Sequence, residues 1–299
     1  MASHSCTSCL LLLFLAYVVA CLLLRYQRRN GMAKAFNYPN RHSFAKMTND
    51  DAHAISKILI ELEFPTLFST SVFFALFKVC SCTFLHCLVV SILETLSADA
   101  LLQTYGIPSI SSLLCDTGQL ASTTTSSRRA ADTGVILTEV VLNKPTSKRT
   151  IDGIARMNYL HSGYRKAGKI SDADMMYTLS LFALEPTRWT RRFEWRTLTD
   201  MEACAIGTFW KDMGDAMEIP YTALESGATG CRDGLQWLQE LEEWSLRYEE
   251  ANMVPAESNK QLAIGTMDLL LWNLPRRWRG VANSFVAAVL EPRLRTAMM

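Results

Sequence analysis

The chain has 299 residues, which suffices for one large domain or two small ones. Its net charge of +1 argues against a nucleic-acid-binding protein, because such proteins carry a basic total or a basic face. Of its nine cysteines only Cys115, Cys204 and Cys231 lie beyond the first hundred residues, and their wide spacing argues against a disulfide framework and indicates a reducing compartment.

Residues 9–24 form an uninterrupted apolar run, CLLLLFLAYVVACLLL, with no lysine or arginine before it and several after it. The run is slightly short for a membrane span, but residues 5–8 can extend it to about 20 residues. Positive charge stays in the cytosol, so we expect a lumenal N-terminus and a cytosolic body. A cleaved signal peptide would have a basic start and a small-residue cleavage site, and neither is present. We therefore predict a single-pass anchor in residues 1–30 and a folded body in residues 31–299.

The first part of the body begins with turn residues and continues into a helix. Residues 37–40, NYPN, are typical of a linker. Thr48 has the spacing of a helix cap, and Pro65 should end the amphipathic helix that follows. His42 and His53 have no paired ligand at a useful spacing, and we interpret both as surface residues.

Residues 79–103, VCSCTFLHCLVVSILETLSADALLQ, are apolar and rich in cysteine but have no amphipathic periodicity. A second membrane helix is one interpretation, although charged residues and a histidine interrupt the run. A metal cluster of cysteines and His86 is another, but the spacing matches no standard site. Our hypothesis is a retained intron translated in frame, because Val79 and Gln103 are compatible with GT and AG ends. Sequencing the transcript across this segment tests that hypothesis.

Residues 128–142 predict a helix on which three polar side chains, Arg129, Asp132 and Thr133, share one face. A guanidinium, a carboxylate and a hydroxyl on one face can form a structural hydrogen-bond cluster. They can equally line the distal side of a cofactor, where proton donors act on bound dioxygen. From the residues alone, the structural interpretation is favoured.

The stretch 151–168, IDGIARMNYLHSGYRKAG, predicts a helix that Gly168 ends. It carries His161, the one histidine in the second half of the chain. A neutral imidazole on a packed helix is a good iron ligand, although a lone histidine there is more often a core or surface residue. If a metal acts here, one axial histidine under a macrocycle is the simplest arrangement. The residues that share its face are Met157, Asn158, Tyr164 and Arg165.

The remaining segments also have helical periodicity, and none alternates as a strand does. Ser171 and Thr199 have capping-box spacings. The first of these helices should end at Pro186, followed by a basic aromatic loop, TRWTRRFEWR. Pro255 should end a later helix, and residues 262–274 and 281–298 supply the last two. The sequence lacks G-x-S-x-G, P-loop and HExxH motifs. These patterns predict an all-α fold.

Six segments carry a family resemblance: NYPNRHSFAKMT, TYGIPSIS, RRAADTGVILTEVVLN, ARMNYLHSGYRKAGKISDADMMYTLSLFALEPTRW, DGLQWLQELEEWSLRYEEANMVP and LEPRLRTAMM. From about Asn37 to the C-terminus, without residues 79–103, the chain resembles the fungal ER-bound oxygenases of the mycophenolic acid pathway type. These are related to the catalytic domain of bacterial rubber oxygenase (latex clearing protein). The resemblance implies an all-α, globin-like, multi-helix domain with haem b.

The resemblance also implies site residues. The proximal histidine of the rubber-oxygenase branch follows Arg-x-x-x-Leu, which here is Arg156 to Leu160, and so falls on His161. The distal Arg-x-x-Lys-Thr motif falls on Arg129, Asp132 and Thr133, with aspartate in place of lysine. An ionised aspartate would disfavour anions derived from dioxygen unless it is paired.

The leading hypothesis is therefore an oxidoreductase at the ER membrane, with a cytosolic catalytic domain. It would oxidise a lipophilic secondary metabolite or cleave its C=C bond oxidatively, as such substrates concentrate in the bilayer. Two alternatives stay open: a cyclase or isomerase that uses Asp132 as an acid, and a non-catalytic membrane scaffold. The expected catalytic residues are Arg129, Asp132 and Thr133, and the expected haem-binding residues are Arg156, His161, Tyr164 and Arg165, with His161 as the iron ligand.

Overall fold

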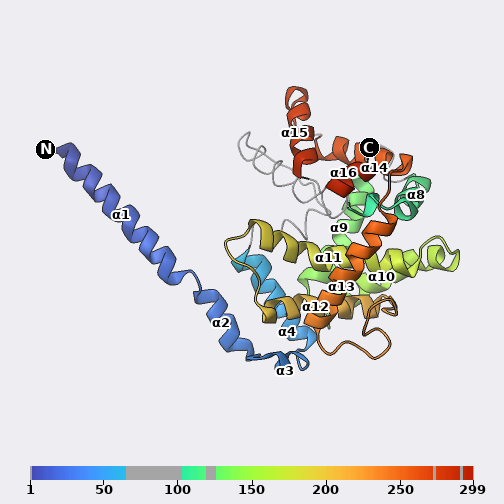
Figure 1. Ribbon diagram of the computed structural model, residues 1–299, viewed down its shortest axis with the longest axis horizontal. Helices are drawn as coiled ribbons and strands as arrows, with labels where there is room; N and C mark the ends of the chain where they lie inside the picture. Colours follow the sequence, from blue (N-terminus) through green and yellow to red (C-terminus); the bar gives the residue numbers. More distant parts are fainter. Residues whose placement is uncertain (1, 65–102, 119–125, 272–273, 290–291, 299) are drawn as a thin grey trace. The chain divides into compact units, whose positions relative to one another are not determined.

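The computed structural model describes the chain except residues 1, 65–102, 119–125, 272–273, 290–291 and 299 (Figure 1). For residues 2–11, 126–131, 266, 268–270 and 285–289 it describes the backbone alone. The described residues form helices and no strand, so the predicted all-α class is confirmed for this part of the chain. The segment 79–103, with its three interpretations, lies outside the described residues apart from Gln103.

The chain divides into two compact units, Met1–Ser43 and Phe44–Met299. The boundary between the units follows Ser43, whereas the predicted anchor ends at residue 30, which lies inside the helix Gln27–Phe36. The first unit holds α1 (Ala2–Leu24), α2 (Gln27–Phe36) and most of α3 (Arg41–Phe44). Asn37 ends α2 with a positive φ of 49°, in agreement with the predicted turn. None of the described helices combines the length and the apolar character required to cross a membrane.

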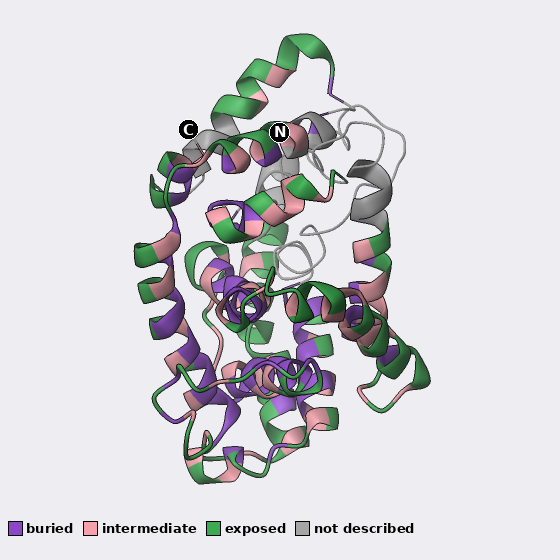
Figure 2. Ribbon diagram, turned by 90° about the vertical axis from the view of Figure 1, so that its right-hand side faces the viewer, coloured by how far each residue is buried: buried purple, intermediate pink, exposed green. Residues whose placement is uncertain are grey.

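The second unit contains the helices that form the core. Their bounds are α4 (Asn49–Ile58), the π-helix η1 (Leu59–Glu63), α8 (Pro108–Asp116), α9 (Ser126–Leu142), α10 (Lys148–Lys166), α11 (Asp172–Phe193), α12 (Asp200–Ala216), α13 (Gly234–Asn252), α14 (Glu257–Leu270), α15 (Arg276–Val289) and α16 (Pro292–Ala297). Helix α12 packs against α13, α4 and α11, and α10 packs against α9. The buried residues lie mainly on α11, α12 and α13, and Figure 2 shows the buried positions gathered in the interior.

The centre of the core is formed by large side chains and by one close helix crossing. Tyr177 and Trp237 are fully buried. At the crossing of α12 with the start of α13, a Cβ on Gly207 would lie 2.0 Å from the carbonyl oxygen of Gly234. Since no side chain fits in that space, glycine at position 207 permits the two backbones to approach.

The predicted helix starts and stops are mostly confirmed. Thr48, Ser171 and Thr199 each accept a hydrogen bond from the backbone N–H three residues later. Gly168 follows α10 with a φ of +66°, the left-handed conformation that glycine adopts readily. These signals are local in sequence, which is why the sequence predicts them.

The predicted end of a helix at Pro186 is wrong, because α11 continues to Phe193. Burial after the proline explains this: Trp189 and Thr190 are 6% and 1% exposed. The indole of Trp189 also donates to Glu185 Oε2 across the proline, at 3.0 Å. Tertiary contacts therefore outweigh the loss of one backbone hydrogen bond. The residues expected to form a loop lie largely on the helix.

The surface interpretation of His53 is also wrong. His53 is 6% exposed on α4, and its Nε2 lies 3.2 Å from the carbonyl oxygen of Val141 on α9. Burial lowers the pKa of His53, and the positive charges of Lys57 and Lys144 act in the same direction. The helix predicted over residues 281–298 is wrong too, since α15 begins at Arg276 and α16 is a separate helix.

Among the described cysteines, Cys21, Cys115, Cys204 and Cys231 are free thiols.

Candidate functional site

Helices α9 and α10 form an antiparallel hairpin whose closed end is fixed by polar contacts. Ser147 caps α10, and Thr150 Oγ1 donates to the carbonyl oxygen of Lys144, at 2.9 Å. The guanidinium of Arg149 pairs with the carboxylate of Glu139 across the two helices. Side chains before and after the turn between α9 and α10 therefore hold the turn in place.

The register of the hairpin follows from Gly153. A Cβ on Gly153 would lie 3.0 Å from the Val140 side chain and 3.7 Å from the carbonyl oxygen of Ile136. A further eight residues along α10, about 12 Å, lead to His161, and the same distance back along α9 leads to about residue 130. His161 thus lies level with the predicted residues Arg129, Asp132 and Thr133. The helical periodicity that places Ile136 and Val140 toward α10 places these three positions on the same side of α9.

The other edge of the His161 face rests on the end of α12. Asn158 Nδ2 donates to the carbonyl oxygen of Ala216, at 2.9 Å. Met157 is buried, whereas His161 itself is half-buried and its Nδ1 is enclosed by protein atoms. The predicted face is therefore the inward face of α10, between α9 and the end of α12.

Arg165 lies on this face but binds the protein itself. Its guanidinium donates to the carbonyl oxygens of Met217 and Glu218, at 3.2 and 3.1 Å, and to Asp172 Oδ1, at 3.0 Å. These contacts satisfy carbonyls at the end of α12, so the geometry favours a structural role over the predicted contact with a cofactor.

Arg156 does not lie beside His161. It precedes His161 by five positions, which places it about 140° around the helix. Its side chain is exposed, with Cζ 5.4 Å from the centroid of the Tyr159 ring. Tyr164 is 38% exposed and lies on the His161 side. Of the four residues predicted to bind a cofactor, His161, Tyr164 and Arg165 share one side of α10, and the guanidinium of Arg165 is held by carbonyl groups of the protein.

On α9, the three predicted residues differ in what the structure describes. Asp132 is exposed and Thr133 is half-buried. Arg129 has a helical backbone, and its side chain is not among the described ones. Histidine on α10, with arginine, aspartate and threonine at these positions of α9, is a set of residue types that could hold an iron macrocycle with ionised propionates. Among the described residues, no group of three or more His, Cys, Asp or Glu could hold a bare metal ion.

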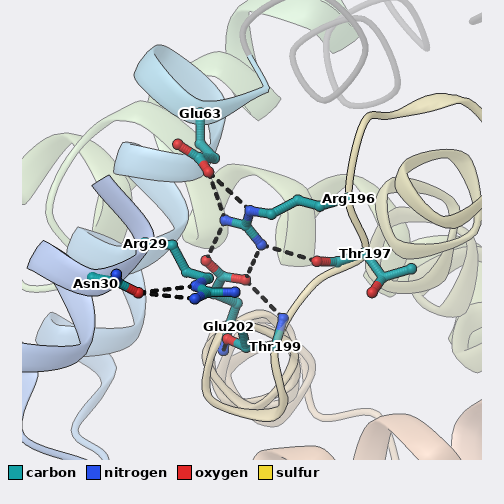
Figure 3. Close-up of polar contacts among 7 residues, drawn as sticks. All are labelled: Arg29, Asn30, Glu63, Arg196, Thr197, Thr199 and Glu202. Atoms are coloured by element: carbon teal, nitrogen blue, oxygen red, sulfur yellow. Dashed lines mark hydrogen bonds and ion pairs between the residues drawn. The ribbon is translucent and has the colours of Figure 1, made fainter. Parts of the chain in front are cut away.

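A buried ion cluster that sequence analysis missed surrounds Arg196 (Figure 3). Its guanidinium donates to Glu63 and Glu202 at 2.8–2.9 Å, and these two side chains are 3% and 0% exposed. Burial disfavours the charge of Arg196, but hydrogen bonds to Glu202 and Glu63 and their charges outweigh it and raise the pKa of the guanidinium. We call these three residues the Arg196 cluster. It joins η1 to the start of α12.

A second missed cluster surrounds Arg188 on α11. Its Nη1 lies 2.9 Å from Glu185 and 3.9 Å from Glu249 on α13. The hydroxyl of Tyr177 donates to Glu249, at 3.3 Å. Burial, followed by the charges of Glu249 and Glu185, raises the pKa of Tyr177 well above its ordinary value, so this phenol stays protonated. The cluster ties α11 to α13. The available sequence signal was Glu185 at an apolar position of the helical pattern.

Three known proteins that resemble this chain carry the name of one family. No protein-family model matches the chain. The chain is 44% identical over 285 residues to the ER-bound oxygenase mpaB' of Penicillium brevicompactum, which covers 95% of this chain and 62% of that protein. It is 42% identical over 287 residues to the ER-bound oxygenase mpaB of Penicillium roqueforti (strain FM164), which covers 96% of this chain and 88% of that protein.

A further relative, the ER-bound oxygenase mpaB of Penicillium brevicompactum, is 44% identical over 259 residues, or 87% of this chain and 60% of that protein. The chain thus spans about three fifths of the length of both Penicillium brevicompactum relatives. It spans most of the Penicillium roqueforti protein, and the identity extends over almost all of this chain. The family resemblance is confirmed: the chain belongs to the mpaB family of fungal ER-bound oxygenases.

Proposed function

We propose that the chain is an oxygenase attached to the ER membrane, with haem b as its cofactor and a lipophilic small molecule as its substrate. The names of its relatives support oxygenase activity and attachment to the ER. The observation that carries the haem proposal is the register of the α9–α10 hairpin, which sets His161 level with Arg129, Asp132 and Thr133.

In this proposal His161 is the iron ligand, because a neutral imidazole on an inward helix face is suited to bind iron. A bound haem would supply the iron centre at which dioxygen is activated. Arg129 carries a permanent positive charge that suits a propionate or an anionic oxygen species. The hydroxyl of Thr133 can donate a hydrogen bond on the same side, and the carboxylate of Asp132 can accept a proton.

Asp132 changes the electrostatics of this side relative to the rubber-oxygenase pattern, where lysine stands. With aspartate, the positive charge of the three-residue set comes from Arg129 alone. Because Arg129 and Asp132 are three apart on a helix, they can pair and reduce the repulsion of an anion by the carboxylate. We infer that Asp132 serves as a proton acceptor or orients Arg129, rather than binding an anion itself.

We further propose that residues 9–24 attach the chain to the ER membrane as a single pass, with the folded body in the cytosol. The basic residues that follow the apolar run support this orientation. Lipophilic substrates partition into bilayers, so attachment would raise their concentration near the enzyme.

The test is the haem content of the full-length chain purified in detergent after supply of haem. We expect a Soret band with close to one haem per chain, lost in His161→Ala. His42→Ala is the matched control, because His42 is exposed and belongs to the other unit. A wild-type chain without a Soret band would contradict the haem proposal. Loss of product in Asp132→Asn would then favour the cyclase or isomerase alternative, and unchanged product would favour the scaffold.

A further inference from the structure

The first turns of α15 form an exposed surface. Trp278 and Val281 are 44% and 63% exposed, and Arg276 and Arg277 are exposed beside them. Figure 2 draws this helix mostly in the colour of exposed residues. Exposed aromatic and aliphatic side chains next to arginines usually mark a contact surface rather than a solvated helix.

The helical periodicity sorts these residues into two faces. Trp278 and Val281, three apart, share one side of α15. Arg277 and Arg279 each lie about 100° from Trp278, one on either side of the apolar face. Arg279 Nε also donates to the carbonyl oxygen of Leu274, at 3.0 Å, which ties the start of the helix to the preceding turn. The result is an amphipathic helix with an apolar face bordered by cations.

All charged residues of α15 are positively charged. Residues 276–289 contain three arginines and no acidic residue. Within the described part of the chain, no ion pair joins Arg276 or Arg277 to a carboxylate. Cations in the first turn of a helix are disfavoured by its dipole, so these arginines reduce the stability of the isolated helix. A choice of residues that opposes local stability often serves function.

We propose that this face of α15, formed by Trp278 and Val281 and bordered by Arg277 and Arg279, lies on an anionic membrane surface. Trp278 and Val281 would enter the interfacial layer, where indole rings are favoured. The arginines would contact lipid phosphates while their stems cover apolar surface. A helix with a cationic border and a narrow apolar face is the kind that lies in the membrane interface.

A membrane is favoured over a nucleic acid or a protein groove as the partner. The near-neutral net charge of +1 argues against nucleic acid, and the relatives are named as ER-bound. The contact is distinct from the proposed anchor in residues 9–24, because it lies in the second unit. The α15 contact would hold the folded body against the bilayer, in addition to the tether that the anchor provides. The proposal for α15 does not depend on haem.

The experiment uses the full-length chain with vesicles whose lipids carry bromine on the acyl chains, with or without phosphatidylserine. The emission of Trp278 is obtained as the difference between wild type and Trp278→Phe. We expect vesicles with phosphatidylserine to quench more than half of it. In Arg277→Gln much of that emission should return, because an arginine near an anionic surface contributes about fivefold to binding.

Trp195 is the matched control, because it is 38% exposed and lies in the second unit as well. Its emission, obtained from Trp195→Phe, should not be quenched. Flotation with the vesicles reports attachment separately, so failure of the anchor and failure of α15 are distinguishable. The proposal is overturned if the chain does not float with anionic vesicles, or if it floats with Trp278 unquenched. Equal quenching in neutral vesicles, or a response of Trp278 to polynucleotide alone, overturns it as well.

Discussion

Removing the cation from the Arg196 cluster should destabilise the second unit more than any surface substitution. In Arg196→Met, the carboxylates of Glu63 and Glu202 would remain buried without their partner. The guanidinium also donates to the carbonyl oxygen of Thr197, at 2.9 Å, so five hydrogen bonds are lost together. Methionine retains much of the aliphatic volume, so the change isolates the loss of charge.

The expected cost follows from the burial of the two carboxylates. Breaking a buried ion pair by removal of one partner costs about 3–5 kcal/mol. For a unit of this size, each kcal/mol corresponds to roughly 2–4 °C in melting temperature, so Arg196→Met should melt about 6–20 °C lower. Urea unfolding followed by circular dichroism of the full-length chain in detergent measures the free energy directly.

Arg191→Met is the control for this prediction. The side chain of Arg191 is 59% exposed and its Nη1 lies 3.6 Å from Glu242, so its removal should cost at most about 1 kcal/mol. A loss below about 1 kcal/mol in Arg196→Met, or an equal loss in both variants, would refute the argument that burial determines the strength of this cluster.

Three further predictions concern packing, titration and the end of α12. Gly207→Ala should lower the free energy of unfolding by about 1–3 kcal/mol or more in denaturant titrations, because its Cβ would overlap the backbone of α13. His53→Gln should make the free energy of unfolding depend less on pH in the acid range. Because the pKa of His53 is lowered in the folded state, its contribution to stability is complete above about pH 6.5 and is lost as the pH falls toward the pKa of the folded state. Arg165→Met should cost about 1–3 kcal/mol, because carbonyls at the end of α12 lose their donor.

Each packing prediction has a control within the same chain. Gly163→Ala on α10, where a Cβ meets nothing within 4 Å, should stabilise by about 0.5–1 kcal/mol. Arg156→Met should leave melting almost unchanged, because its side chain is exposed. Equal losses in Arg165→Met and Arg156→Met would exclude the structural role of Arg165. Parallel pH profiles of wild type and His53→Gln would show that His53 does not titrate with unfolding.

The features that the sequence predicted correctly are those with local causes. Thr48, Ser171 and Thr199 satisfy backbone groups three residues away, so their spacing alone identifies a helix start. The positive φ of Gly168 needs no distant residue to stabilise it, because glycine has no Cβ and adopts this conformation readily.

The features that the sequence did not predict depend on residues distant in the chain. Pro186 lies inside a helix because Trp189 is buried, and that burial depends on other helices. Arg196 meets Glu63 across 133 positions, so no local pattern could pair them. Arg165 was correctly placed on the face of His161, but its partners are carbonyls at the end of α12. Local periodicity gives the side of a helix that faces inward, but it does not give the group that lies opposite.

The central claim is that the imidazole of His161 binds the iron of a haem between α9 and α10. The most direct measurement is the absorption spectrum of His161→Gly, supplied with haem, before and after addition of free imidazole. We predict that the substitution abolishes the Soret band of the ligated haem and that imidazole restores it, because the small ligand replaces the missing ring. A His161→Gly chain that keeps the wild-type spectrum without imidazole would contradict the claim.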